Sequence, residues 1–224
     1  MENNIDTIAN DLVQRASVMA AGAAMDAKDM LHPEIDEFVR QSLKTGSELM
    51  LSCASLAHGA NELAVNVLTR SIIELSLKMH WATFSSENAK HLLAISTEQM
   101  KAFFVVNAKT GIIKVVDREG NDFTTKFLSS GRAERGQKPI SIEIMARQAG
   151  LIDLYNVFYR LQSMHTHSHC VFSVDTQTSA LTLNSVGAFS VLLGHIGVSW
   201  LVHRNRPDNE KIRSLLGLND SVSP

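Results

Sequence analysis

The 224-residue sequence contains only two cysteines, Cys53 and Cys170, and no excess of charge of either sign. Two cysteines so far apart do not make a disulfide framework, which favours a reducing compartment. The 21 basic and 23 acidic side chains give a net charge of −2, so a protein that binds polyanions over its whole surface is excluded. Any contact with nucleic acid needs a local basic patch. The N-terminus lacks the basic segment and apolar core of a signal peptide, so we expect a cytoplasmic protein.

The sequence also lacks an uninterrupted apolar run of the roughly 20 residues that span a bilayer. The closest candidate is Val186–Val202, which Ser190, His195 and Ser199 interrupt. A membrane span is the alternative for this segment. Its glycines favour close helix contact instead, so we expect a buried central helix and no membrane partner. These glycines are Gly187, Gly194 and Gly197.

Most of the remaining sequence has the apolar spacing that is typical of helices. Pro33 suits the first turn of a helix, Ser141 suits an N-cap, and Gly150 suits a left-handed stop. We expect an all-α fold, an antiparallel helical bundle that forms a single domain over residues 1–224. The expected helices cover about 5–25, 33–57, 60–84, a stretch from 86, 141–150, 152–167, 184–203 and 208–216, with 171–182 extended or irregular.

One region departs from the helical pattern. From Phe103 to Phe127, valine, isoleucine, phenylalanine and threonine dominate, and residues 110–111 and 119–122 have the composition of turns. We therefore expect a small inserted β-hairpin near residues 112–127, followed by a polar loop at 129–139. The expected strands are Ile112–Val116 and Phe123–Phe127. The whole insertion covers about 103–139.

Two groups of polar residues are candidate sites, and the first is the pair Arg70 and Glu74. On the helix expected at 60–84 the two side chains point in similar directions, about 40° apart. Four apolar residues share that direction: Leu63, Val67, Leu77 and Trp81. The spacing therefore predicts a charged pair in an apolar stripe, which is costly unless the charges are well paired. The pair is either a structural tie between helices or the wall of a site.

The second group lies between residues 155 and 170. In a strand its three histidines would face one way and, with Cys170, would form a comb of metal ligands. No second cluster of histidine and cysteine completes such a site, so we expect neither a metal nor a cofactor. In a helix, His167 aligns with Arg160, about 20° away. The group comprises Asn156, Tyr159, Arg160, Ser163, His165, His167, His169 and Cys170.

Arg160 and His167 suit phosphodiester cleavage, because a fixed cation stands beside a group that titrates near neutrality. The histidine could move the proton of a ribose 2′-hydroxyl, while the arginine stabilises charge on the phosphorus. The two residues are about 10 Å apart along a helix, too far to grip one phosphate alone. A two-fold dimer could bring two copies of the pair together.

Both Arg160-Leu-Gln-Ser-Met-His165 and its extension to His167 fit the R-x4–6-H pattern of the HEPN superfamily. Its members are α-helical, usually dimeric proteins, and many are metal-independent RNases of toxin–antitoxin, phage-defence and RNA-processing systems. More specifically, Ile142–His167 looks like part of a bacterial helical family of unknown function with the motifs R-x-x-x-E and Y-R-x-x-S-x-x-x-H. The first motif is Arg70 to Glu74 here. The resemblance covers about residues 45–205.

The resemblance implies that Arg160 and His167 are catalytic and that Glu74 and Arg70 support them. It leaves open whether His165 or His167 pairs with Arg160, and Leu161 stands where catalytic members usually have a polar residue. Two functions follow: a metal-independent endoribonuclease that acts on RNA as a homodimer, or a non-catalytic helical module that binds a protein partner or small ligand. The candidate binding residues are Ser163, Tyr159, Asn156 and His165.

Overall fold

The structure, a computed structural model, describes residues 2–25, 31–58, 61–129, 139–160, 162–163 and 176–203. It contains two compact units: unit 1 is Met1–Ala89 with Ser141–Pro224, and unit 2 is Lys90–Ile140. Among the described residues every regular element is a helix, which confirms the all-α class. The elements are α1 (Glu2–Ala23), α2 (Pro33–His58), α3 (Glu62–Ala82), α4 (Ser86–Lys109), α5 (Thr124–Ser129), α6 (Ile142–Gln148), α7 (Ile152–Leu154), η1 (Tyr155–Tyr159) and α9 (Thr176–His203).

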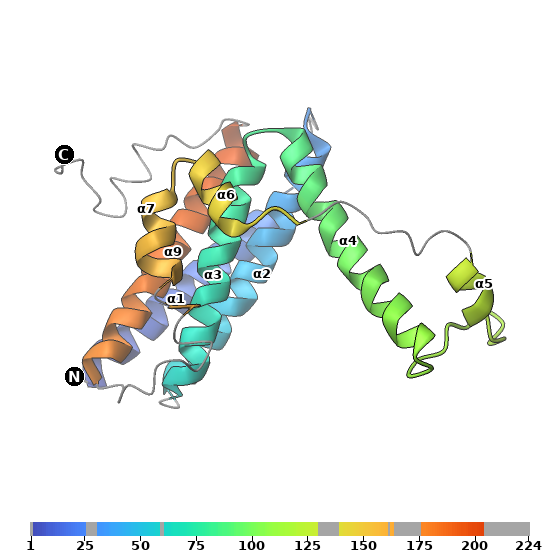
Figure 1. The fold of residues 1–224 in the computed structure, drawn as a ribbon. Helices are drawn as coiled ribbons and strands as arrows, with labels where there is room; N and C mark the ends of the chain where they lie inside the picture. The colour runs from blue at the N-terminus through green and yellow to red at the C-terminus, as the bar shows by residue number, and fades with distance from the viewer. Residues whose placement is uncertain are drawn as a thin grey trace. The chain divides into compact units, whose positions relative to one another are not determined.

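Four long helices of unit 1, α1, α2, α3 and α9, pack against one another (Figure 1). α9 contacts each of the other three, α2 contacts α1 and α3, and α6 contacts α3. Each long helix buries a row of apolar side chains at helical spacing, which supplies most of the stabilising burial. Fully buried members of these rows include Leu12, Leu43, Met50, Ile72, Leu77, Phe189 and Ile196.

Helices α2 and α9 approach each other closely at two glycines. A Cβ atom at Gly197 would lie 2.6 Å from Leu43 Cδ2, and one at Gly46 would collide with Leu193. The predicted close contact is therefore confirmed at Gly197. It is wrong at Gly187, where a Cβ atom would meet nothing within 4 Å.

Buried polar side chains also tie α9 to α2 and α3. Trp200 Nε1 donates to Asp36 Oδ1 at 2.7 Å, which joins α9 to the first turn of α2. Thr182 Oγ1 lies 3.0 Å from Asn66 Oδ1 and joins α9 to α3. Thr182 belongs to the helical part of α9, which begins at Thr176 and not near Asn184, so the prediction of an extended segment is wrong from residue 176 onward.

One segment of the described chain, Asn184–Val202, is long and apolar enough to cross a membrane by length and composition alone. Just over half of it is buried inside the protein. Its buried residues face α1, α2 and α3, as expected of a helix in the middle of a helical layer.

Three predicted helix ends are confirmed in unit 1. α2 begins at Pro33 with Glu34 and Asp36 in its first turn. Ser141 caps α6, because its hydroxyl oxygen accepts the Ile144 N–H at 3.3 Å. Gly150 follows α6 with a φ of 69°, a left-handed conformation that glycine adopts without strain.

In unit 2 the predicted β-hairpin is wrong, since the described residues of this unit contain no strand. α4 continues through Phe103 to Lys109, because Val105 and Ala108 are buried one helical turn apart. A glycine in the left-handed conformation then ends the helix. Gly111 has a φ of 73°, and the Ile112 N–H donates back to the Asn107 carbonyl at 2.9 Å.

The rest of the predicted hairpin forms a tight turn and a short helix. Val116 and Asp122 make one isolated antiparallel bridge around Gly120, which has a φ of 88°. Asp122 Oδ1 then accepts the Thr124 N–H at 2.9 Å and so starts α5, which ends the extended pairing. The predicted turns are therefore confirmed, and the predicted strands are wrong. Most of the predicted polar loop, residues 130–138, lies outside the described residues.

Candidate functional site

Tyr159 joins α3 to η1 and collects three of the predicted site residues at one point. Arg70 Nη2 donates to Tyr159 Oη at 3.2 Å, and Tyr159 Oη donates to Glu74 Oε2 at 3.3 Å. The Arg70 guanidinium also lies over the Tyr159 ring, 5.2 Å from its centroid, where the ring attracts a cation. We call these three side chains the tyrosine cluster.

The charged residues of the tyrosine cluster are half-buried, because the expected apolar stripe is dry at only one end. Leu77 and Trp81 are buried, as predicted, but the other end of the stripe is exposed. Leu63 and Val67, which share their face of α3, are 67% and 43% exposed. Glu74 Oε1 accepts a charged hydrogen bond of 2.5 Å from Lys78 Nζ, with both side chains partly in solvent. The α3 face is thus covered where η1 packs on it and is wet toward the start of the helix.

The segment before Arg160 is not a regular α-helix. The predicted helix starts at Ile152 as expected, but Tyr155–Tyr159 form a π-helix in which the Arg160 N–H donates to the Tyr155 carbonyl. Single π turns inside helices occur frequently at functional sites. The wider turn changes the directions that a regular helix would give to side chains on either side of it.

Arg160 itself is exposed, although the preceding residue is buried. Tyr155 and Tyr159 stack beside it, with ring centroids 5.1 Å apart and planes at 21°. Burial raises the pKa of the Tyr155 hydroxyl above its ordinary value of 10, and the Glu143 carboxylate adds to that effect, whereas Arg160 and Arg70 oppose it. Tyr155 is therefore a neutral hydroxyl at physiological pH, in the electrostatic range of both arginines.

The remaining predicted site residues lie as follows. Asn156 is exposed and Ser163 is half-buried. His165 and His167 lie outside the described residues, so the choice between them stays open. No group of histidine, cysteine, aspartate and glutamate in the described ranges is arranged to hold a metal ion.

Sequence reasoning missed two participants, Lys78 and Tyr155. Both stand one helical turn from a chosen residue, Lys78 after Glu74 and Tyr155 before Tyr159. Residues at i and i+4 on a helix are neighbours, so this spacing was a signal available in the sequence.

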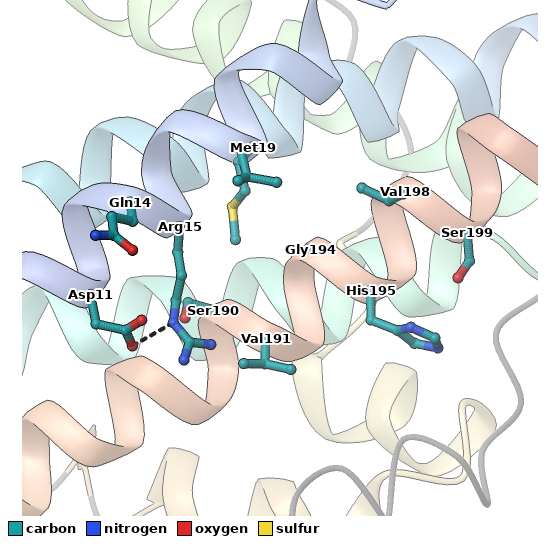
Figure 2. Close-up of a pocket in the computed structure, with 11 residues that line it drawn as sticks. Asp11, Gln14, Arg15, Met19, Ser190, Val191, Gly194, His195, Val198 and Ser199 are labelled. Carbon is teal, nitrogen blue, oxygen red and sulfur yellow. Dashed lines mark hydrogen bonds and ion pairs between the residues drawn. The ribbon is translucent and has the colours of Figure 1, made fainter. Parts of the chain in front are cut away.

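A groove of about 470 Å³ between α1 and α9 is a second candidate site (Figure 2). At one end Arg15 forms an ion pair of 2.7 Å with Asp11, one turn earlier on α1. Met19 points toward Gly194, which leaves space for the groove, and His195 lies toward the other end (Figure 2). The sequence did not reveal the groove, because its walls are about 180 residues apart along the chain.

Fold and cluster together define an all-α protein with a polar site between a long helix and a π turn. Residues 37–175 match the model of a family of unknown function, DUF5677, and the chain belongs to this family. The match includes Arg70, Glu74, Tyr159 and Arg160, and it confirms the resemblance to a helical family of unknown function. No curated protein and no solved structure matches the chain significantly.

Proposed function

We propose that the protein is a metal-independent endoribonuclease of HEPN type, an antiparallel helical bundle that acts as a homodimer. The observation that carries the proposal is the position of Arg160, an exposed cation directly after the anchored Tyr159. A charge that stands on a fixed turn and faces solvent can meet a phosphate with little reorganisation, and such preorganisation is what stabilises charge in a transition state.

The chemistry assigns one role to each residue type. The imidazole of His167 removes the proton from a ribose 2′-hydroxyl, whose oxygen attacks the adjacent phosphorus. Arg160 stabilises the negative charge that grows on the phosphoryl oxygens. The bond from phosphorus to the 5′-oxygen breaks, and a protonated histidine of the second copy supplies the proton to that oxygen. The products are a 2′,3′-cyclic phosphate and a 5′-hydroxyl.

In this proposal the tyrosine cluster positions the arginine and does not touch the reacting atoms. Arg70 and Glu74 hold the Tyr159 hydroxyl from two sides, so the turn that ends at Arg160 is fixed against α3. Lys78 holds Glu74 in turn. Loss of the cluster should therefore weaken cleavage less than loss of Arg160 does.

Cleavage of a 5′-labelled single-stranded RNA tests the proposal. Arg160→Ala and His167→Ala should each lower the rate by roughly 100-fold or more, the usual contribution of such groups, and EDTA should have no effect. Arg147→Ala, an exposed arginine on α6, and His195→Ala in the α1/α9 groove are matched controls and should cleave normally. Intact RNA with the wild-type protein, or cleavage that EDTA stops, would exclude the proposal.

The α1/α9 groove favours a second candidate, a non-catalytic helical module that binds a small ligand. Its volume of about 470 Å³ falls within the range of ligand sites in proteins. In that case the tyrosine cluster is only a structural tie. A ligand found by thermal shift should stabilise the wild-type protein but not Gly194→Phe, which fills the groove. Equal stabilisation of both proteins would remove the groove as the site.

A further inference from the structure

Unit 2 differs in charge from the rest of the chain. Lys90–Ile140 contains nine basic and five acidic side chains, a net charge of +4, whereas the remaining residues contain twelve basic and eighteen acidic ones, a net charge of −6. The overall charge of −2 hides this separation. The net charge of unit 2 therefore favours contact with a polyanion.

The part of α4 in unit 2 presents aromatic side chains to solvent. Phe103 and Phe104 are 56% and 42% exposed and touch edge to face, with ring centroids 5.7 Å apart. Met100, one turn earlier, is exposed as well. Val105 and Ala108 are buried; Phe103 lies on the opposite side of α4 from them, and Phe104 lies at the edge of the buried face. The exposed rings are thus not part of the core of the described structure.

Basic side chains accompany the rings. Lys109 lies in the last turn of α4, on a different side of the helix from the two rings, and Lys114 follows soon after it; both are exposed. Elsewhere in the unit, Lys126 Nζ lies 5.2 Å from the centroid of the Phe123 ring. Exposed rings together with lysines are the combination by which proteins hold single strands of nucleic acid, because bases stack on the rings and ammonium groups contact the phosphates.

We propose that the α4 surface, which comprises Met100, Phe103 and Phe104, binds single-stranded RNA, while Lys109 and Lys114 contact its phosphates. The inference rests on the proposed nuclease function for the class of ligand and specifies its substrate as unpaired RNA. Duplex RNA does not suit this surface, since its bases are stacked inside the helix and its major groove is too narrow for side chains.

Binding of a fluorescent 20-nucleotide 2′-O-methyl RNA to the full chain, measured by anisotropy, tests the inference. This probe has no free 2′-hydroxyl, so binding is measured without the proposed cleavage. Phe103→Leu/Phe104→Leu keeps the helix and the apolar character but removes the rings, and should weaken binding about tenfold or more. Phe103→Tyr/Phe104→Tyr keeps the rings and should bind within about threefold of the wild type. A matched duplex should bind at least tenfold more weakly than the single strand.

The contribution of the lysines is measured by the salt dependence of binding. Lys109→Gln/Lys114→Gln should reduce the slope of log affinity against log salt by about 1 to 1.5, because each phosphate contact of a single strand contributes about 0.7. Val13→Ala/Val18→Ala on α1 changes two exposed apolar residues of unit 1 and should leave the affinity unchanged. Circular dichroism and melting temperature should be the same for all variants, since the substituted side chains are exposed.

Unaltered binding of the leucine variant would overturn the inference, and so would an equal loss in the leucine and tyrosine variants. A change of molecular mass in light scattering that accompanies the leucine substitutions would also overturn it, since the surface would then be an interface with a second copy. These outcomes are separate from those of the nuclease proposal. If binding depends on the rings but natural RNA is not cleaved, only the nuclease proposal is wrong. If RNA is cleaved but binding does not depend on the rings, only the proposal for the α4 surface is wrong.

Discussion

Two hydrogen bonds between helices of unit 1, here called polar ties, each join a carboxylate to an aromatic donor. They lie in different surroundings. Asp36 and Trp200 meet between α2 and α9, where both are buried. Glu74 and Tyr159 meet between α3 and η1, where the carboxylate also contacts a lysine and is partly wet. The comparison shows that a buried tie can only hold helices together, whereas a half-open tie leaves charged groups within reach of a ligand.

The largest effect is expected at the buried tie. Trp200→Phe leaves the Asp36 carboxylate without its indole donor, and the lost bond together with the lost volume should cost about 2–4 kcal/mol, or roughly 5–15 °C in melting temperature. Trp81→Phe is the matched control, because Trp81 is equally buried but donates to Gln148, an exposed amide that water can solvate. Equal losses in calorimetry for the two variants would contradict the importance of the buried carboxylate.

The close approach of α2 and α9 supports the same tie and should give the next largest effect. Gly197→Ala pushes a methyl group against Leu43 and should destabilise the protein by about 1–3 kcal/mol in urea unfolding. Gly187→Ala lies on the same helix with free space around it, so it should raise stability by up to about 1 kcal/mol through helix propensity. An equal change in the free energy of unfolding for both variants would show that the close contact at Gly197 does not determine stability.

The half-open tie should matter less for stability. Tyr159→Phe removes the hydroxyl between Arg70 and Glu74 and should cost about 1 kcal/mol, since solvent can replace part of the bonding. Tyr155→Phe, which keeps the stacked ring and leaves the cluster bonds intact, should stay within about 0.5 kcal/mol of the wild type. A loss at Tyr159 as large as that at Trp200 would remove the distinction between the two ties.

The smallest effect concerns pH. The chain has two tyrosines, so Tyr159→Phe leaves Tyr155 as the only phenol to titrate. Its absorbance at 295 nm should change at a higher pH in the native protein than in urea, because burial raises its pKa above 10. The folded state holds this proton more tightly, so the associated stability is present below pH 10 and is lost as the pH rises through the folded pKa. Identical native and unfolded titrations would contradict the assigned burial.

The sequence predicted the parts of the fold that depend on local chemistry. Pro33, Ser141 and Gly150 mark helix ends because each acts through its own backbone or hydroxyl group. The segment at 103–127 is ambiguous in sequence, since valine and phenylalanine suit strands and buried helical turns alike. Burial of Val105 and Ala108 identifies residues 103–109 as the end of α4, whereas Asp122 starts α5.

The candidate site, too, was predictable from the sequence only in its local features. Helical spacing places Arg70 next to Glu74, but it cannot say how wet their face is, because that depends on how much of α3 is covered by η1. Nor does a periodic pattern reveal the π turn before Arg160, since the 3.6-residue wheel assumes regular bonding throughout.

By itself the sequence determined the helical class, several helix ends and the choice of Arg70, Glu74 and Tyr159 as candidate site residues. The tertiary structure decided what those residues do, because their bonds run between segments 85 and 89 residues apart. It also decided that Asp36 is dry and Glu74 is not. Burial is a property of the neighbours that a helix acquires on folding, and the spacing of its own residues does not contain that information.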